Sequence, residues 1–230
     1  MSRLDFLRRF LRRIPEPSPD DLDSFLTKLR GVIHVGANAG QESWEYEKLL
    51  LDVIWIEPQP LIFKKLEANT SHFPRQRAFQ RLIADRDGVE HVFHVANNDG
   101  LSSSILDLKD HRDIWPQVDY EDAMTLEAVT LDTLLANERI DQRKFDGLVL
   151  DTQGSELLVL KGAMRLLRSI RWIKTEAADF EAYAGGCSIA DLDSFLRPLG
   201  FTEFTRKSFA KREGGGECFD VVFRRRGRMF

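Results

Sequence analysis

The sequence predicts an α/β protein with an open, mostly parallel β-sheet. An apolar run at residues 32–35 leads into a glycine-rich turn and a helix with a polar start, as in a buried strand and its crossover. A second apolar run ends in Glu57, about 20 positions after Gly36. Strand-like runs at 201–206 and 219–226, joined by a glycine-rich connection, favour an antiparallel pair at the end of the chain.

The glycine-rich turn carries the strongest functional signal. Glycine allows positive φ and leaves no Cβ atom in the way, so Gly36 and Gly40 let backbone N–H groups approach a ligand. A carboxylate at the tip of the next strand, here Glu57, accepts hydrogen bonds from both ribose hydroxyls. The alternative is that the glycines form only a tight turn and that Glu57 is a solvated strand end.

The composition is that of an ordinary globular protein. The 230 residues are 43% hydrophobic and 30% charged, enough for one domain with a full core. The net charge of −4 argues against a general nucleic-acid binder, so we expect no nucleic-acid partner. Cys187 and Cys218 fit neither a disulfide framework nor a metal-ligand pattern. No cluster of His, Cys and Asp predicts a required metal, so we expect no metal site, and an ion at Asp151 is the alternative. Reduced thiols, with no apolar run of about 18 residues and no signal peptide, predict a cytoplasmic protein.

The N-terminal residues 1–14 are predicted to form a basic amphipathic helix. Its arginines are opposed only by Asp5, and its apolar residues fall largely on one helical face: Leu4, Phe6, Leu7, Phe10, Leu11 and Ile14. Such a helix docks on the protein body or a second subunit, or lies on an anionic membrane surface. A proline-rich stretch follows, so we expect residues 1–19 to be helix and linker and residues 20–230 to be the domain.

Helix and strand patterns alternate through the first half of the domain. The predicted elements are a helix at 20–30 capped by Asp20 or Asp21, a strand at 32–35, a helix after Gln41, a strand at 53–57, a helix that begins at Pro58 or Pro60, and a third strand at 80–84. In such folds the tip of the third strand lies near the base of the cofactor. Asp85 therefore either accepts a hydrogen bond from an exocyclic amine or is simply a turn residue.

The middle of the chain is less regular. Residues 89–96 alternate enough to predict an inserted strand beside the third strand. The polar loop at 97–104 is either a surface loop or a cover over the cofactor or substrate. Residues 107–123 are polar and acidic, with Trp115 and Tyr120 as isolated aromatics, and suit a lid or a region that contacts the acceptor.

The second half returns to a βαβ pattern. Its predicted elements are a helix after residues 129–136, a strand at 145–151, a helix at 155–170, a strand at 172–177, and a helix at 189–200 capped by Ser188. Asp151 ends the first of these strands and Glu176 lies near the tip of the next. Because ligands bind at the tips of parallel strands, both acids are candidates for one crevice. The alternative for each is a structural carboxylate that accepts backbone N–H groups.

Four segments together resemble the FkbM-type S-adenosylmethionine-dependent methyltransferases over roughly residues 30–223. They are VIHVGANAGQ, IEPQP, NNDGLSSS and LDTQGSELLVLKGA. The resemblance implies the class I methyltransferase fold, a Rossmann-like three-layer sandwich around a seven-stranded, mostly parallel sheet whose last two strands form an antiparallel pair. It also implies methyl transfer from S-adenosylmethionine, usually to a hydroxyl of a sugar, polyketide or related metabolite. The implied partner is a small-molecule or glycan acceptor.

The resemblance assigns roles to individual residues. Those implied to bind the cofactor are Gly36, Ala37, Asn38 and Gly40 at the methionine part, Glu57 at the ribose, and Ala84 and Asp85 near the adenine. Asp151 would lie beside the methionine amine or the acceptor. The chain departs from the family at His34, where an aspartate is usual. His34 is either a core histidine or a base near the acceptor.

Methylation of a hydroxyl requires a base that removes its proton during attack. Asp151 is the first candidate, with Glu176 and His34 in reserve. Two other functions remain open at this point. A nicotinamide-dependent oxidoreductase explains Gly36 and Glu57 equally well, although the turn lacks the G-x-G-x-x-G spacing. A non-enzymatic module that binds a membrane or a partner through residues 1–14 is the second.

Overall fold

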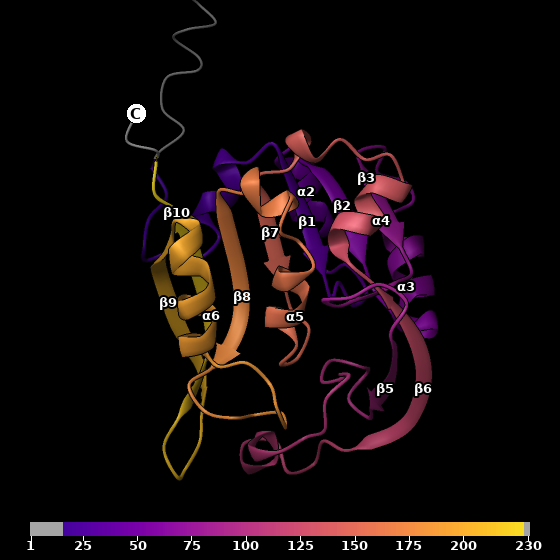
Figure 1. Cartoon of the computed structure of the whole chain (residues 1–230), viewed down its shortest axis with the longest axis vertical. Helices are drawn as coiled ribbons and strands as arrows, with labels where there is room; N and C mark the ends of the chain where they lie inside the picture. The colour runs from indigo at the N-terminus through magenta and orange to yellow at the C-terminus, as the bar shows by residue number, and fades with distance from the viewer. Residues whose placement is uncertain (1–15, 228–230) are drawn as a thin grey trace, which may run out of the picture.

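The structure, a computed structural model, describes residues 16–227, so the predicted helix at 1–14 lies outside the described residues. A seven-stranded sheet runs through the domain in the order β3-β2-β1-β7-β8-β10-β9 (Figure 1). Its strands are β1 (Gly31–Val35), β2 (Asp52–Ile56), β3 (Gln76–Phe79), β7 (Gly147–Leu150), β8 (Trp172–Ala178), β9 (Phe201–Lys211) and β10 (Glu217–Arg225). Only β10 pairs in antiparallel fashion, with β8 and with β9. This arrangement confirms the predicted class I methyltransferase fold.

Helices cover both faces of the sheet, as its alternating apolar side chains require. They are α2 (Ser43–Lys48), α3 (Pro60–Thr70), α4 (Leu131–Asn137), α5 (Glu156–Lys161) and α6 (Ile189–Leu196). In β1, Ile33 and Val35 pack with residues of α4, α5 and α6. Val32 faces the other side, where it shares a core with Tyr46 of α2 and Leu66 of α3. The result is the predicted three-layer sandwich.

A smaller sheet of order β4-β6-β5 lies beside the main one. It consists of β4 (Leu82–Ile83), β5 (Glu90–Ala96) and β6 (Tyr120–Val129). The inserted strand predicted at 89–96 is therefore confirmed, but it pairs with β6 and not with the third strand. The ten-residue β6 falls partly in the segment predicted to be irregular. Most of its side chains are at least partly exposed, so the segment lacks the apolar pattern that marks a buried strand.

The prediction that residues 80–84 form the third strand of the main sheet is wrong, because Leu82 and Ile83 form a strand of the smaller sheet. The third strand of the main sheet is β3, an edge strand that pairs only with β2, whereas Leu82 and Ile83 pair with β6. The polar sequence of β3 gives no apolar signal because an edge strand is half exposed. The apolar pattern that predicted a strand here comes from Leu82 and Ile83, which are buried in the smaller sheet.

Several helix boundaries also differ from the predictions. The segment predicted as a helix at 20–30 forms only a 3₁₀ turn, Ser24–Lys28. The helix predicted at 155–170 ends at Lys161, before Gly162, where a Cβ atom would lie 2.2 Å from the carbonyl oxygen of Ala84. The cap at Ser188 is confirmed: its side chain accepts from the Asp191 backbone, and Asp191 accepts from the Ser188 N–H at 2.9 Å. Within residues 16–227, no helix combines the length and apolar character of a membrane span.

Candidate active site

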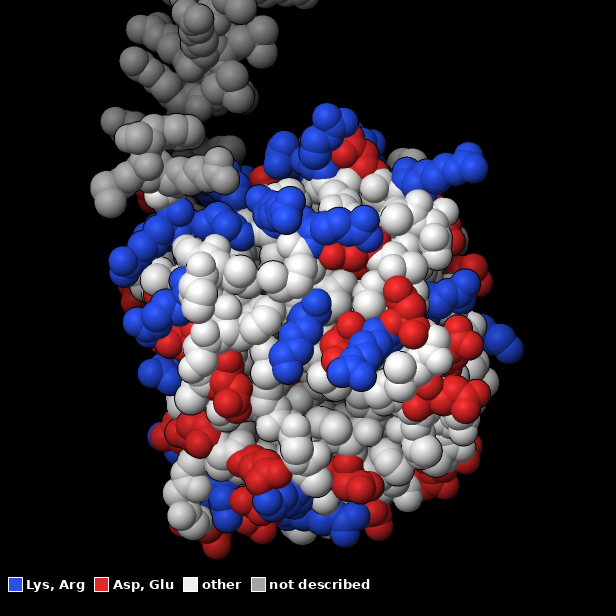
Figure 2. All heavy atoms as spheres, in the orientation of Figure 1, with Lys and Arg blue, Asp and Glu red and all other residues white. Residues whose placement is uncertain are grey.

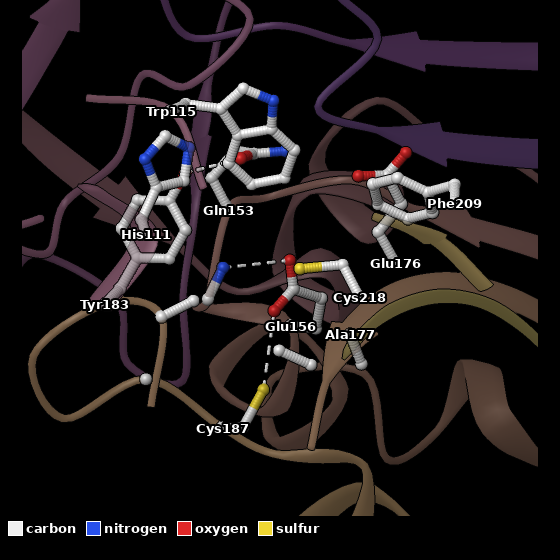
Figure 3. A pocket seen from close by; sticks show the side chains of 14 residues that line it. His111, Trp115, Gln153, Glu156, Glu176, Ala177, Tyr183, Cys187, Phe209 and Cys218 are labelled. Carbon is white, nitrogen blue, oxygen red and sulfur yellow. Dashed lines mark hydrogen bonds between the residues drawn. The ribbon is translucent and has the colours of Figure 1, made fainter. Parts of the chain in front are cut away.

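Two pockets open where the parallel strands end. The first, the glycine-turn pocket, is lined by residues that include Gly36, Asn38, Glu57, Ile83, Phe93 and Asp151. The second, the aromatic pocket, is lined by residues that include His111, Trp115, Glu176, Tyr183 and Phe209 (Figure 3). Gln153 lines both pockets and so marks their junction. Carboxyl ends of parallel strands are the usual ligand sites of open α/β sheets.

Gly36 allows the turn after β1 to lie directly against the end of β7. Its φ is +78°, and a Cβ atom at this position would lie 1.7 Å from the carbonyl oxygen of Asp151. The N–H groups of Gly36 and Ala37 both donate to the carbonyl of Ile56, each at 3.0 Å. Glycine is therefore required here by the close approach of two backbone segments as well as by conformation.

Glu57 anchors the same turn from the end of β2. Its side chain is only 7% exposed, and its Oε2 atom accepts from the Asn38 N–H at 3.0 Å while Oε1 accepts from the Gln59 N–H at 2.9 Å. Burial raises the pKa of Glu57 to about 7, against the effect of these two N–H groups. Each carboxylate oxygen has a second lone pair. The side chain can therefore hold the turn and still accept from a ligand in the pocket.

The other residues predicted to bind the cofactor lie around the pocket in different ways. Gly36, Asn38 and Glu57 line it, whereas Ala37 and Gly40 are absent from its lining. Ala37 is buried in the core, and Gly40 packs so closely that a Cβ atom would lie 2.7 Å from Leu66.

Ala84 and Asp85 are also absent from the pocket wall. Ala84 is fully buried, while the wall at the predicted adenine end is formed by Arg81, Leu82 and Ile83. The predicted residues lie too far along the chain because β4, which was predicted as the third strand of the main sheet, belongs to the smaller sheet. The pocket is lined by β4 itself and by Arg81 before it.

Asp151 follows β7 directly and lines the glycine-turn pocket. Its Oδ1 atom accepts a hydrogen bond from the Gln153 side-chain amide at 2.5 Å. Burial raises the pKa of Asp151 to about 7, and the nearby carboxylate of Glu156 adds to the rise. A carboxylate with a pKa near neutrality is a better proton acceptor than an ordinary aspartate.

The loop after Asp151 positions Gln153 between the pockets. Gln153 has a φ of +53°, and its Oε1 atom accepts from the Tyr183 hydroxyl at 2.5 Å. The buried Glu156 accepts from the N–H groups of Thr152 and Gly154, at 2.9 Å and 3.2 Å, and so fixes this loop. Gln153, Glu156 and Tyr183 were not predicted as site residues. Gln153 and Glu156 lie within the segment LDTQGSE, which resembles the family, whereas no sequence pattern marks Tyr183.

The aromatic pocket is built from segments that are distant in the sequence. In Figure 3 the rings of His111, Trp115 and Tyr183 lie on one side, with Glu176 and Phe209 on the other. The His111 ring lies 4.6 Å from that of Trp115 and 5.3 Å from that of Tyr183. Burial lowers the pKa of His111 to about 4, so this ring is neutral at pH 7. Lysine and arginine are absent from the residues that line the pocket.

Glu176 brings a second acid into the aromatic pocket. It lies within β8, opposite Asp220 of β10, and is half-buried. Burial raises the pKa of Glu176 to about 9, with Asp151 the strongest of the nearby acids that add to it. Asp151 and Glu176, predicted to point into one crevice, therefore line two different pockets that adjoin at Gln153.

His34 is a core residue. It is 5% exposed, and its ring stacks on Trp55 at 5.2 Å and lies 6.3 Å from the ring of Tyr46. Burial lowers the pKa of His34 to about 3. It lines neither of the two pockets. This position agrees with the core interpretation of His34.

Groups of three or more metal-ligating side chains that could hold an ion are absent from residues 16–227. The acids around Asp151 are instead held by hydrogen bonds. Glu156 accepts from two backbone N–H groups and from the Cys187 thiol at 3.4 Å.

Comparison with known proteins concerns the family and the fold of the chain. Residues 34–203 match the model of the Methyltransferase FkbM domain. No curated protein matches the chain in sequence. Among solved structures, an uncharacterized protein from Listeria monocytogenes serotype 4b is 9% identical with a TM-score of 0.50, over 94% of this chain and 70% of that chain. At this identity the likeness concerns the fold.

Two solved structures of methyltransferases have TM-scores similar to that of the Listeria protein. The 1,6-didemethyltoxoflavin-N1-methyltransferase of Burkholderia thailandensis is 13% identical with a TM-score of 0.49, over 97% of this chain and 84% of that chain. Magnesium protoporphyrin IX methyltransferase from Synechocystis PCC 6803 is 11% identical with a TM-score of 0.49, over 98% of this chain and 86% of that chain.

Proposed function

The chain belongs to the FkbM methyltransferase family, and on this premise we propose that it transfers the methyl group of S-adenosylmethionine to a hydroxyl of a small-molecule or glycan acceptor. The observation that carries the proposal is the junction of the two pockets at Gln153, whose side-chain amide donates to Asp151 at 2.5 Å. One pocket suits an adenosyl cofactor and the other suits the acceptor. Asp151 lines the cofactor pocket beside this junction.

The residues of the glycine-turn pocket fit an adenosyl cofactor. The turn at Gly36 lies directly against the backbone of Asp151, so the turn and the end of β7 together form one wall of the pocket. Glu57 supplies a buried carboxylate suited to ribose hydroxyls. Leu82, Ile83 and Phe93 give apolar surface for the base. When bound, S-adenosylmethionine supplies an electrophilic methyl group on a positively charged sulfur, and the nearby carboxylates favour that charge.

The aromatic pocket suits an uncharged ring. Trp115 and Tyr183 offer flat surfaces, and the absence of lysine and arginine from its lining disfavours a phosphate or carboxylate at this position. Glu176, with a pKa of about 9, is protonated at pH 7 and donates a hydrogen bond to an acceptor oxygen. These features support a hydroxylated, neutral ring as the methylated part of the acceptor.

Asp151 is the proposed general base. Its pKa of about 7 leaves a large fraction ionised at neutral pH while keeping the carboxylate more basic than usual. Gln153 holds its Oδ1 atom and is itself held by Tyr183, so the orientation of the carboxylate is fixed before an acceptor binds. Asp151 accepts the hydroxyl proton as the oxygen attacks. This assignment makes Gln153 a positioning residue and not a proton carrier.

Calorimetric titration of the full chain with S-adenosylhomocysteine, and separately with NADH, tests the cofactor. We expect binding of S-adenosylhomocysteine and none of NADH. The reverse result would favour the nicotinamide-dependent oxidoreductase, and binding of neither would favour a non-enzymatic module. Incubation with methyl-deuterated S-adenosylmethionine and a metabolite extract, followed by mass spectrometry, then identifies the acceptor and shows whether the new bond is to oxygen.

A further inference from the structure

Phe209 gives the aromatic pocket a second flat wall. It lies in β9, where Ala210 pairs with Cys218 and Ser208 pairs with Phe219, so that Phe209 between them has no partner in β10. Such a β-bulge turns a side chain out of the regular alternation of a strand. The ring of Phe209 lines the pocket and is 47% exposed. About half of this ring is therefore free to contact a ligand.

Trp115 forms the opposite wall of the pocket. In Figure 3 its indole ring lies across the pocket from Phe209, on the side where His111 and Tyr183 also lie. The His111 ring packs against the indole, with their centroids 4.6 Å apart, and supports it from behind the wall. Aromatic rings attract one another through offset stacking, which uses both faces of a planar ring. Aromatic walls on opposite sides of one pocket consequently favour a planar ring between them.

Ion pairs join the two walls. Arg212, which follows β9, pairs with Asp110 at 3.0 Å and with Asp113 at 2.7 Å. Both aspartates lie in the 3₁₀ turn Asp110–Asp113, just before Trp115. Figure 2 shows side chains of both charges close together along the lower side of the molecule, where Figure 1 shows the end of the β9–β10 hairpin. These contacts link the hairpin that carries Phe209 to the turn that leads to Trp115.

The aromatic pocket offers few free polar side chains to an acceptor. Gln153 is already bonded to Asp151 and to Tyr183, and Glu156 to the backbone of the loop that it fixes. Glu176 is the lining acid whose side chain forms no hydrogen bond with another described residue. A sugar carries several hydroxyl groups, and each one that is buried without a partner costs about 1–3 kcal/mol. A ring with one or two hydroxyl groups fits this lining better.

The acidity of the proposed base also favours one kind of hydroxyl. A phenol hydroxyl has a pKa of about 10, as in tyrosine. An aliphatic hydroxyl is about as weak an acid as water, with a pKa of about 16. The pKa of Asp151, about 7, is much closer to that of a phenol. Because proton transfer is efficient when donor and acceptor have similar pKa values, a phenol loses its proton to Asp151 far more readily.

We infer that the acceptor is a phenol, whose aromatic ring lies between Trp115 and Phe209. The inference rests on the proposed function and narrows it to one class of acceptor. The phenol oxygen forms a bond to the methyl carbon while the bond from that carbon to sulfur breaks. The sulfur keeps the electron pair of that bond, and the hydroxyl proton goes to Asp151. Phe209 and Trp115 are then residues that determine specificity.

Ligand-observed NMR with two small probes tests the inference. Phenol and cyclohexanol, which share a six-membered ring and one hydroxyl group, are titrated into the full chain in the presence of S-adenosylhomocysteine. The test variant is Phe209→Ala, and Phe209→Trp is the conservative variant. Trp44→Ala is the matched control, since Trp44 is also a large exposed ring, at 61%, and lines neither pocket. Circular dichroism melts establish that the variants are folded.

We expect phenol to bind about tenfold more tightly than cyclohexanol. Phe209→Ala should weaken phenol binding by about tenfold, because one of the two stacking faces is lost. Phe209→Trp and Trp44→Ala should retain it. Equal binding of the two probes, no binding of phenol at millimolar concentrations, or phenol binding that survives Phe209→Ala would each overturn the inference.

The methylated product separates this inference from the proposed function. After incubation with methyl-deuterated S-adenosylmethionine and a metabolite extract, we expect the new methoxy group on an aromatic ring. A new methoxy group on a saturated ring would overturn the phenol and leave methyl transfer to oxygen in place. Failure of S-adenosylhomocysteine to bind would instead overturn the proposed function, and this inference with it.

Discussion

A Cβ atom on Gly36 would lie 1.7 Å from the carbonyl oxygen of Asp151, although the two residues are far apart in the sequence. This contact holds the turn after β1, which lines the glycine-turn pocket, against Asp151, the proposed base at the end of β7. Position 36 therefore sets both the shape of the glycine-turn pocket and the place of Asp151.

Replacement of Gly36 by alanine should damage both stability and cofactor binding. The new methyl group collides with backbone that cannot move aside, and the positive φ adds strain, so we expect a loss of about 2–5 kcal/mol in the free energy of unfolding. Gly88→Ala is the matched control, since Gly88 has a φ of +74° with nothing within 4 Å. It should lose only the conformational part, about 1–2 kcal/mol. Urea unfolding measures both; equal losses would contradict the contact.

Glu57→Gln should weaken cofactor binding while the protein stays folded. The amide NH₂ group would face either the Asn38 or the Gln59 N–H, leaving one buried donor unsatisfied. That penalty of about 1–3 kcal/mol lowers the free energy of unfolding. The amide also replaces one oxygen that would accept from the ribose, so we expect calorimetry to show roughly a tenfold or greater loss of affinity for S-adenosylhomocysteine. Glu67→Gln, at an exposed position of α3, should bind normally. Unchanged affinity in the Glu57 variant would show that the carboxylate has no part in binding.

Asp151→Asn should separate chemistry from binding. Asparagine keeps a side-chain oxygen for the Gln153 contact but cannot accept the acceptor's proton. We expect turnover to fall by about 10²–10⁴-fold once an acceptor is known, with the affinity for S-adenosylhomocysteine changed little. If affinity and turnover instead fall together, Asp151 belongs to the cofactor site alone.

The rate should follow a bell-shaped curve with pH. Asp151 must be ionised to act as a base, so kcat/KM rises as pH passes about 7. Glu176 must be protonated to donate, so the rate falls as pH passes about 9. Glu176→Gln should remove the alkaline limb and leave the acidic limb in place. An acidic limb that survives in Asp151→Asn would assign the lower pKa to another group.

Glu176 should also make stability fall with rising pH. Its folded pKa is about 9, against about 4.3 in an unfolded chain, so between these values the folded state holds a proton that the unfolded state releases. Stability is then highest below the unfolded pKa and declines as pH rises towards 9. Thermal melts should show Glu176→Gln a few degrees more stable than the parent at pH 8 and equal to it at pH 4. The exposed Glu213→Gln should match the parent at both.

Some residues of the candidate site could be predicted from the sequence, and others could not. Gly36, Asn38, Glu57 and Asp151 were identified because each lies at the end of an apolar strand. Tyr183 was not identified, since it lies in a loop and reaches the site only through its hydroxyl contact with Gln153. No local pattern encodes a contact between two loops.

The sequence by itself determined the parallel strands, the glycine-rich turn, the cap at Ser188 and the terminal hairpin. Each is specified by neighbours in the chain, through side-chain periodicity, a required φ or a local hydrogen bond. Only the tertiary structure decided that β6 completes a second sheet, that β3 lies at the edge, and that His34 is enclosed by Trp55 and Tyr46. These features depend on which distant segments pack together, and an exposed or polar strand carries no periodic signal of its partner.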